Sequence, residues 1–203
     1  MLKLVKNLHY SDLGLALSGG IDSMCIAHFL LNGRKDFTAF YFNHGTSHGR
    51  LAEEFVSKWC EANGVKLVLG HIKDCPLKDV IDSGAQEYYR KCRYHFFHQQ
   101  QNTIILAHHL DDVLETWLFS SMHGDPKLIP YSNGNCIRPF LLSTKDGIKR
   151  YAKKYGVEWI EDESNGSVMY MRNRIRHNIV PEVEIINPGI RKVLAKKIKL
   201  AYN

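Results

Sequence analysis

The chain has 203 residues, of which 44% are hydrophobic and 24% charged, a composition typical of a folded globular protein and not of a disordered or fibrous one. It contains no apolar run of about 18 residues, which excludes a membrane-spanning helix, and its first residues lack the apolar stretch of a secretion signal. The formal net charge of +6 lies entirely after residue 171, because residues 172–203 hold eight basic and two acidic side chains. This surplus suits a polyanionic partner.

Strands and helices are predicted to alternate through the first 122 residues. The strands are expected at 13–18, 37–42, 65–70 and 103–107, and the helices that follow them at 21–30, 50–63, 83–101 and 110–122. This alternation predicts an α/β fold with an open parallel sheet of about five strands and helices on both faces. Many functions share such an architecture, which commonly binds nucleotides.

The rest of the chain is predicted to be mostly helical. A loop rich in Gly, Pro, Ser and Asn at 123–136 separates a nucleotide-binding core, residues 1–135, from residues 136–203. In the second part we expect an extended piece at 136–142, a helix at 144–155, and two basic helices at 170–180 and 189–201. Pro181 and Pro188 should separate the last two helices.

The cysteines are odd in number and widely spaced: Cys25, Cys60, Cys75, Cys92 and Cys136. This pattern is typical of a reducing compartment, so we expect free thiols and a cytoplasmic location. No Cys-x-x-Cys pair occurs, which excludes the common zinc, redox and iron–sulfur motifs.

The segment SGGIDS at 18–23 follows the first predicted strand and opens the first predicted helix. Its glycines let the backbone approach an anion, the helix start offers free N–H groups, and its serines add hydroxyl donors. It is therefore predicted to bind phosphate, although it is neither a Walker A loop nor a GxGxxG loop. Asp22 would repel phosphates unless a divalent cation lay between them, which implies magnesium. The alternative is a Gly-Gly turn with Asp22 as a helix-start charge.

Three other segments combine charges at helical spacing. In AHHLDDVLET at 107–116, which begins where the fourth strand ends, the acidic side chains can cluster on one face, near the sheet edge that binds ligands. RKCRY at 90–94 and RNRIR at 172–176 each put two arginines on one face, which suits contact with phosphates. The alternative in each case is a solvated charged surface.

SGGIDS resembles the SGGxDS loop of the N-type ATP pyrophosphatases, the PP-loop superfamily, which cleave ATP between its α- and β-phosphates and adenylate a carbonyl-type oxygen. Within that superfamily the chain resembles the tRNA(Ile)-lysidine synthetases. The matching segments occur in family order: FNHG (42–45), RKCRY (90–94), AHHLDDVLET (107–116), RPFLL (138–142), DESN (162–165) and YMRNRIRHNIVP (170–181).

This resemblance implies a ligase that uses ATP and Mg²⁺ to modify the wobble cytidine of tRNA(Ile) with a CAU anticodon. The C2 carbonyl oxygen of the base would attack the α-phosphorus and release pyrophosphate, and the ε-amine of free L-lysine would then displace AMP to form lysidine. Two alternatives stay open: tRNA thiolation on the same scaffold, and a non-catalytic RNA-binding module that kept the fold.

The resemblance also assigns roles to the matching residues. The ATP site would comprise Ser18, Gly19, Gly20, Ile21, Asp22, Ser23, Asn43, His44 and His108. The catalytic residues would be Asp22, Asp112, Arg93 and Arg176, with Asp22 and Asp112 as magnesium ligands. The RNA or substrate contacts would be Asp162, Asn165, Arg172, Asn173, Lys196, Lys197 and Lys199.

Many lysidine synthetases continue into C-terminal domains that grip the tRNA, whereas this chain ends soon after RNRIRHNIVP. We expect its last helix to contact the RNA backbone in partial substitution for those domains. A homodimer and an amine other than lysine are further possibilities that the sequence leaves open.

Overall fold

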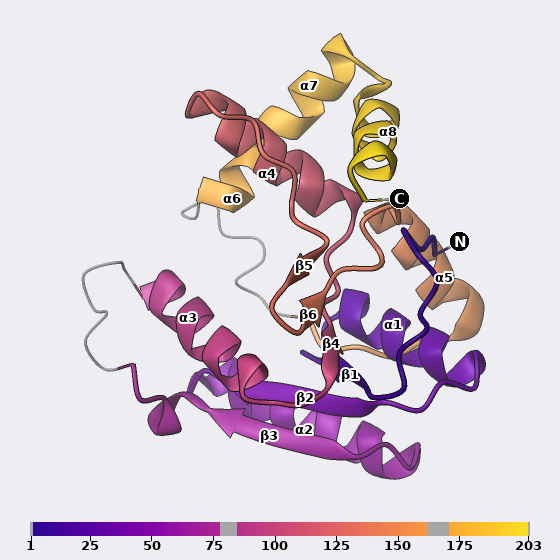
Figure 1. The fold of residues 1–203 in the computed structure, drawn as a ribbon, viewed down its shortest axis with the longest axis vertical. Helices are drawn as coiled ribbons and strands as arrows, with labels where there is room; N and C mark the ends of the chain where they lie inside the picture. The colour runs from indigo at the N-terminus through magenta and orange to yellow at the C-terminus, as the bar shows by residue number, and fades with distance from the viewer. Residues whose placement is uncertain (1, 78–84, 162–170, 203) are drawn as a thin grey trace.

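The computed structural model describes residues 2–77, 85–161 and 171–202, and its centre is a six-stranded sheet in the order β3-β2-β1-β4-β6-β5 (Figure 1). Every neighbouring pair is parallel except β5 with β6. The strands are β1 (Leu13–Ala16), β2 (Thr38–Asn43), β3 (Leu67–His71), β4 (Thr103–Ile105), β5 (Ser132–Asn133) and β6 (Cys136–Ile137). The predicted α/β class is therefore confirmed, although the extended piece expected at 136–142 forms a strand of only two residues.

Helices cover both faces of the sheet. They are α1 (Ile21–Asn32), α2 (Ser47–Ala62), α3 (Ala85–His98), α4 (Leu110–Met122), α5 (Lys145–Tyr155), α6 (Met171–Arg174), α7 (Val180–Ile186) and α8 (Ile190–Tyr202). The alternation of side chains along a strand decides which helices each residue meets. In β2, Ala39 and Tyr41 join the cluster that includes α1, α2 and α5, whereas Phe40 joins the cluster that includes α3.

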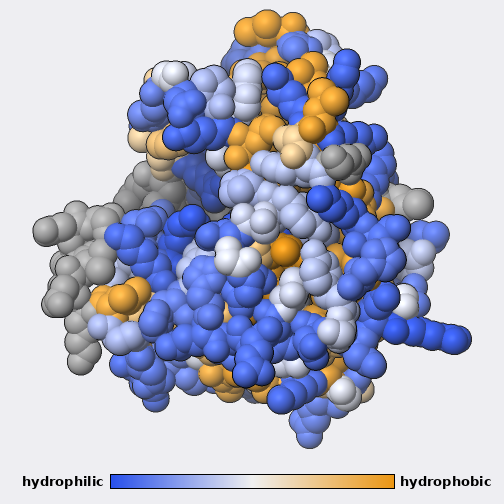
Figure 2. Space-filling model, in the orientation of Figure 1, coloured by the Kyte–Doolittle hydropathy of each residue, from blue (hydrophilic) through white to orange (hydrophobic). Residues whose placement is uncertain are grey.

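The C-terminal helices pack on α4 and not on the sheet. Val113 and Leu114 of α4 share a hydrophobic cluster with Leu194 and Ile198 of α8, and these helices form the upper layer in Figure 1. Because α4 begins where β4 leads out of the sheet, this layer lies at the ligand-binding edge of the fold. Figure 2 shows a mostly hydrophilic face with apolar surface at the end where α7 lies, and α7 carries the exposed Ile185 and Ile186.

The helical segment that starts at Met171 is longer than predicted. It continues to Ile186, and a π-helical stretch, Ile175–Ile179, joins α6 to α7. Pro181 lies in the first turn of α7. A wide π turn just before a proline relieves the clash and the missing N–H that would end a regular helix there. The prediction that Pro181 separates helices is therefore wrong, whereas a break does occur around Pro188.

Residues on either side of the predicted domain boundary contribute to one sheet. β6 pairs with β4, and α5 packs against α1, where Cys25 donates to the carbonyl oxygen of Ile148 at 3.7 Å. The division into residues 1–135 and 136–203 stays a prediction. No helix in the described ranges is long and apolar enough to cross a membrane.

Cys75 and Cys92 form a disulfide, which corrects the expectation that all the cysteines are free thiols. Cys75 follows a short 3₁₀ helix, Ile72–Asp74, that contacts α3, and Cys92 lies within α3. Only packing of that helix against α3 brings the two residues together, so their spacing in the sequence could not reveal the pairing. The free cysteines are buried, and burial raises the pKa of the Cys25 thiol to about 12 and that of the Cys60 thiol to about 11.

We expect alkylation to detect this disulfide in protein purified without reductant. After denaturation the chain should take up three alkyl groups, one for each free cysteine, and all five cysteines should react after reduction; intact-mass spectrometry measures both. Cys75→Ser is the control, because its four remaining cysteines should react equally with and without reduction. Five labels on the unreduced chain would contradict the pairing.

Candidate functional site

The loop between β1 and α1 is held by its own serines. The Ser23 hydroxyl donates to the carbonyl oxygen of Gly20 at 3.0 Å and accepts from the backbone N–H of Ser18 at 3.1 Å. Gly19 has a φ of 82°, and a Cβ there would lie 3.0 Å from Ile160 Cγ2, so this position requires glycine. Gly20, the N-cap of α1, has no side chain to occupy the first N–H groups of the helix. These N–H groups can therefore receive an anion.

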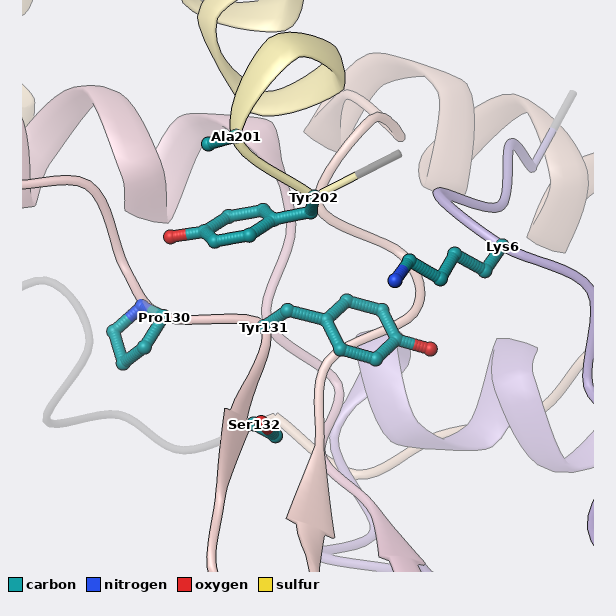
Figure 3. A pocket seen from close by; sticks show the side chains of 6 residues that line it. All are labelled: Lys6, Pro130, Tyr131, Ser132, Ala201 and Tyr202. Carbon is teal, nitrogen blue, oxygen red and sulfur yellow. The ribbon is translucent and has the colours of Figure 1, made fainter.

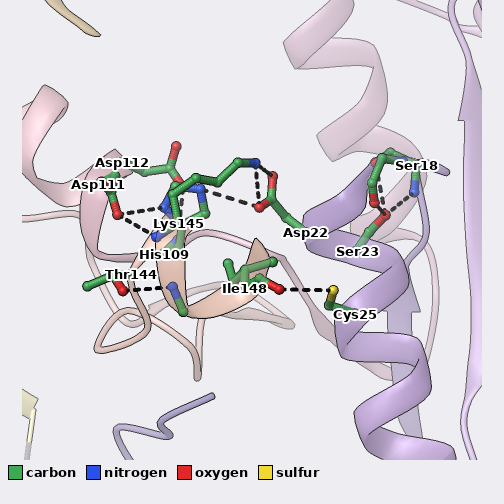
Figure 4. A network of polar contacts seen from close by, with 12 residues as sticks. Ser18, Asp22, Ser23, Cys25, His109, Asp111, Asp112, Thr144, Lys145 and Ile148 are labelled. Carbon is green, nitrogen blue, oxygen red and sulfur yellow. Dashed lines mark hydrogen bonds and ion pairs between the residues drawn. The ribbon is translucent and has the colours of Figure 1, made fainter. Parts of the chain in front are cut away.

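Asp22, in the first turn of α1, points across the site to α5 (Figure 4). Its two carboxylate oxygens each lie 2.7 Å from the ammonium nitrogen of Lys145. His109, which is only 3% exposed, places its Nε2 atom 3.6 Å from Asp22 Oδ1. The phosphate loop, α4 and α5 thus meet at the Asp22 carboxylate.

The two aspartates at the start of α4 have different tasks. Asp111 joins α4 to α5 and to α8. Its Oδ2 accepts from the backbone N–H of Lys145 at 2.7 Å, and its Oδ1 accepts from the Arg191 guanidinium of α8 at 2.6 Å. Asp112 accepts from the backbone N–H of His109 at 2.8 Å. Burial opposes ionisation of Asp112, but His109, His108 and this hydrogen bond hold its pKa below the ordinary value.

One turn further along α4, Glu115 anchors two arginines of the C-terminal helical segment. Its carboxylate is only 2% exposed and accepts from Arg176 Nε at 2.6 Å and Nη2 at 3.2 Å, while Arg172 Nε lies 3.4 Å away. Arg176 Nη2 also lies 3.7 Å from Asp112 Oδ1. Burial works against the charge on Arg176, but Glu115 and Asp112 outweigh it and raise the pKa of the guanidinium. Arg176 is therefore a fixed cation beside the predicted metal ligand.

A second group of nitrogen-bearing side chains lies near the ends of β2 and β4. Within the described ranges no carboxylate pairs with Arg93, and the Nδ1 atoms of His44 and His108 have no hydrogen-bond partner. Burial, followed by the charge of Arg93, lowers the pKa of His44 to about 4, and burial lowers that of His108 to about 3. Both imidazoles are therefore neutral near pH 7. Burial also lowers the pKa of Arg93, but a guanidinium does not lose its proton in proteins, so Arg93 is the charged member of the group.

The remaining predicted residues lie in several places. The side chain of Asn43 is already engaged, because it donates to Glu53 Oε2 at 2.6 Å and accepts from the Gly45 N–H at 2.7 Å. Arg172 and Asn173 lie on α6, and Arg172 contacts Glu115, whereas Asp162 and Asn165 lie outside the described residues. Three lysines of α8 are exposed and stand apart from the Asp22 cluster: Lys196, Lys197 and Lys199.

Three residues of this cluster had no role assigned from the sequence, namely Lys145, His109 and Glu115. Arg191 was expected to contact RNA as part of the last helix, whereas its side chain donates to Asp111. Glu115 lies one helical turn after the predicted ligand Asp112, which was a usable signal. Lys145 is the first residue of α5, where a cation opposes the helix dipole. This unfavourable placement was a second usable signal in the sequence. Nothing local distinguishes His109 from His108, or connects Arg191 to α4.

A small cavity of about 310 Å³ lies elsewhere, between β5 and the end of α8 (Figure 3). Its lining consists of Lys6, Pro130, Tyr131, Ser132, Ala201 and Tyr202. The Lys6 ammonium lies 5.3 Å from the centre of the Tyr131 ring. None of the predicted site residues lines this cavity, so the candidate site is the open cluster around Asp22 and not this pocket.

Two curated proteins with similar sequences have the same name. The tRNA(Ile)-lysidine synthase of Exiguobacterium sibiricum is 32% identical over 200 residues, which cover 93% of this chain and 47% of that protein. The tRNA(Ile)-lysidine synthase of Vibrio cholerae is 31% identical over 201 residues, covering 92% of this chain and 45% of that protein. The chain therefore spans about half the length of the curated relatives it matches.

Among solved structures, the NH3-dependent NAD synthetase of Campylobacter jejuni has a similar fold, with a TM-score of 0.53 and 16% sequence identity over 97% of this chain and 87% of that one. The family model of the PP-loop domain matches residues 1–183. This match includes the SGGIDS loop, the strands β1 to β6 and the arginines that Glu115 anchors. Because the match covers most of its length, the chain belongs to the PP-loop domain family.

Proposed function

We propose that this chain is the catalytic part of a tRNA(Ile)-lysidine synthase, an ATP-dependent ligase. It would adenylate C2 of the wobble cytidine in tRNA(Ile) with a CAU anticodon, releasing pyrophosphate, and would then replace AMP with L-lysine. The observation that carries the proposal is the meeting of Asp22, Asp112 and the Glu115–Arg176 pair beside an open phosphate loop. The names of the similar proteins support the same reaction and favour neither thiolation nor a non-catalytic module.

The phosphate loop supplies the binding of ATP. The free N–H groups at the start of α1 and the hydroxyl of Ser18 would donate to phosphate oxygens. Gly19 and Gly20 leave the backbone of the loop uncovered by side chains. The space beside Gly20 is open, because the atom nearest to a Cβ built there is Ser18 Oγ at 3.6 Å. The neutral His44, beside β2, can contact an uncharged base without a desolvated charge of its own.

The donor set fits a magnesium ion that arrives with the nucleotide. Asp22 and Asp112 offer the hard oxygen ligands that Mg²⁺ prefers, and the lysine ammonium that already sits 2.7 Å from Asp22 supports a cation position there. No three His, Cys, Asp or Glu side chains of the described part of the chain form a metal cage, as expected where one or two carboxylates share the ion with phosphates. When bound, the ion would neutralise negative charge on the triphosphate.

The arginines would stabilise the charge that develops as pyrophosphate leaves. Arg176 is held rigidly by the buried Glu115, so its orientation is set before the substrate binds, which is the condition for efficient electrostatic stabilisation. Arg93 is a cation without a carboxylate partner among the described residues and would thus be available to a phosphate. Removal of Glu115 would free Arg176 and lose this alignment.

The partners follow from the same reaction. Free L-lysine would be the amine, tRNA(Ile) the polyanion that contacts α8, and the cytoplasm the location; a homodimer stays a prediction. A disulfide is uncommon in the cytoplasm. The alkylation experiment on Cys75 and Cys92 therefore also tests the location, because a confirmed disulfide would count against it.

The direct test is ATP cleavage with defined components. With unmodified tRNA(Ile), L-lysine, Mg²⁺ and α-labelled ATP, we expect AMP and pyrophosphate in equal amounts, and AMP release only when both tRNA and lysine are present. Chromatography of the labelled products measures this dependence. Cleavage that needs neither tRNA nor lysine, or no cleavage at all, would contradict the proposal.

Two aspartate variants sharpen that assay. Asp22→Ala should reduce pyrophosphate release by at least about 100-fold, because the divalent cation that neutralises the phosphates in the transition state would lose a ligand. Asp36→Ala, which removes an exposed carboxylate, is the matched control and should react like the unaltered protein. Equal activity of the two variants would remove Asp22 from the mechanism.

The basic surface of α8 has its own test. Replacement of Lys196, Lys197 and Lys199 by glutamine should weaken tRNA binding and flatten its dependence on salt, with a slope on a log–log plot smaller by roughly 0.7–0.9 per lost phosphate contact. ATP affinity should stay unchanged. The matched control replaces three exposed lysines of α5, Lys149, Lys153 and Lys154. If both triple variants bind tRNA alike, α8 is a solvated face and not the RNA contact.

A further inference from the structure

Lys145 is the cation nearest to Asp22 and lies outside every motif that the family resemblance covers. Its ammonium nitrogen contacts both carboxylate oxygens at 2.7 Å, so it occupies the side of the carboxylate that a metal ion would need. The two side chains are 31% and 29% exposed. Water therefore screens the pair, and an ion pair of this kind holds its partners weakly enough for another cation to replace it.

The backbone at Lys145 is fixed independently of its side chain. Its N–H donates to Asp111 at 2.7 Å, and Thr144 caps α5 by accepting from the Gly147 N–H at 3.0 Å. A lysine in the first turn of a helix opposes the helix dipole, which favours acidic residues there. A lysine at position 145 therefore goes against the preference of the first helical turn for acidic side chains, although the fold does not require a lysine there. Such departures from local preference are typical of functional positions.

The groups around Asp22 come from three helices. Lys145 approaches from α5 and His109 from α4, with His109 Nε2 at 3.6 Å, and the carboxylate also acts electrostatically on Arg176. Of these, only Lys145 contacts both oxygens within hydrogen-bonding distance. A divalent ion that takes both oxygens of Asp22 from the side that Lys145 occupies would therefore displace the ammonium.

We propose that Lys145 is a positioning residue that acts as the internal counter-ion of Asp22 in the nucleotide-free protein and competes with the divalent cation for this carboxylate. The proposal rests on the role of Asp22 as a magnesium ligand within the proposed function. It gives Lys145 two states: paired with Asp22 before the nucleotide binds, and released when the cation takes the carboxylate. Because its backbone is anchored to Asp111, the released ammonium stays beside the phosphate loop as a further cation.

The test measures Mn²⁺ binding to the full chain without nucleotide, from the electron paramagnetic resonance signal of free Mn²⁺. Lys145→Met should bind Mn²⁺ about two- to fivefold more tightly than the unaltered protein, the factor expected for loss of a partly exposed ion pair. Lys145→Arg keeps the counter-ion and should leave the affinity unchanged. Lys149→Met, on the exposed side of the same helix, is the matched control and should also leave it unchanged.

A double variant shows whether the effect acts through Asp22. In Asp22→Asn combined with Lys145→Met, the gain in Mn²⁺ affinity should disappear. Lys145→Gln should show the same gain as Lys145→Met and replaces it in the test if the methionine variant does not fold. A gain that persists without Asp22, an affinity that Lys145→Met leaves unchanged, or no Mn²⁺ binding by any variant would overturn the proposal.

The outcome is separable from that of the proposed function. Tighter Mn²⁺ binding by Lys145→Met, together with no lysine-dependent AMP release by the unaltered protein, would contradict the proposed ligase activity and support the proposed role of Lys145 as a counter-ion. Unchanged Mn²⁺ binding by Lys145→Met, together with lysine-dependent AMP release by the unaltered protein, would support the ligase activity and overturn the role of Lys145 as a counter-ion.

Discussion

The first turn of α4 holds the whole candidate site together. Its buried His109 faces Asp22 of the phosphate loop, its Asp111 binds the backbone of Lys145 and the side chain of Arg191, and Glu115 one turn later binds Arg176. The phosphate loop, α5 and the C-terminal helices therefore all depend on one short segment. The hydrogen bonds that Asp111 and Glu115 accept fix the relative positions of these parts, whereas the buried Nδ1 atom of His109 has no hydrogen-bond partner among the described residues.

The arrangement separates binding charges from structural charges. Asp111 and Glu115 are committed to arginines and to a helix start, so they align other groups and do not face a substrate. Among the described residues, Asp22 is paired with a partly exposed lysine and faces His109 at 3.6 Å, and Arg93 has no carboxylate partner. The groups left for exchange with a ligand are thus an acid beside the phosphate loop and cations around it, as transfer of a nucleotidyl group requires.

Local patterns were enough to predict the α/β class and the glycine turn between the first strand and the first helix, because hydrophobic periodicity and the Gly-Gly pair are visible in neighbouring residues. The pairing of Asp22 with Lys145 spans 123 residues and that of Glu115 with Arg176 spans 61, and no periodicity connects residues so far apart. The Cys75–Cys92 disulfide was missed for the same reason, because it depends on how elements pack. The continuation of the helix through Pro181 was missed for a different reason: a local π turn accommodates the proline, and the sequence pattern does not reveal that turn.

In the proposed function, the basic C-terminal helices and the phosphate loop act in one reaction on RNA. The most direct measurement is mass spectrometry of the anticodon nucleosides of tRNA(Ile) after incubation with this protein, ATP and a mixture of amines. We predict that cytidine at the wobble position gains lysine and that no other amine replaces it. An unmodified or thiolated cytidine, or an adduct at another base, would contradict it.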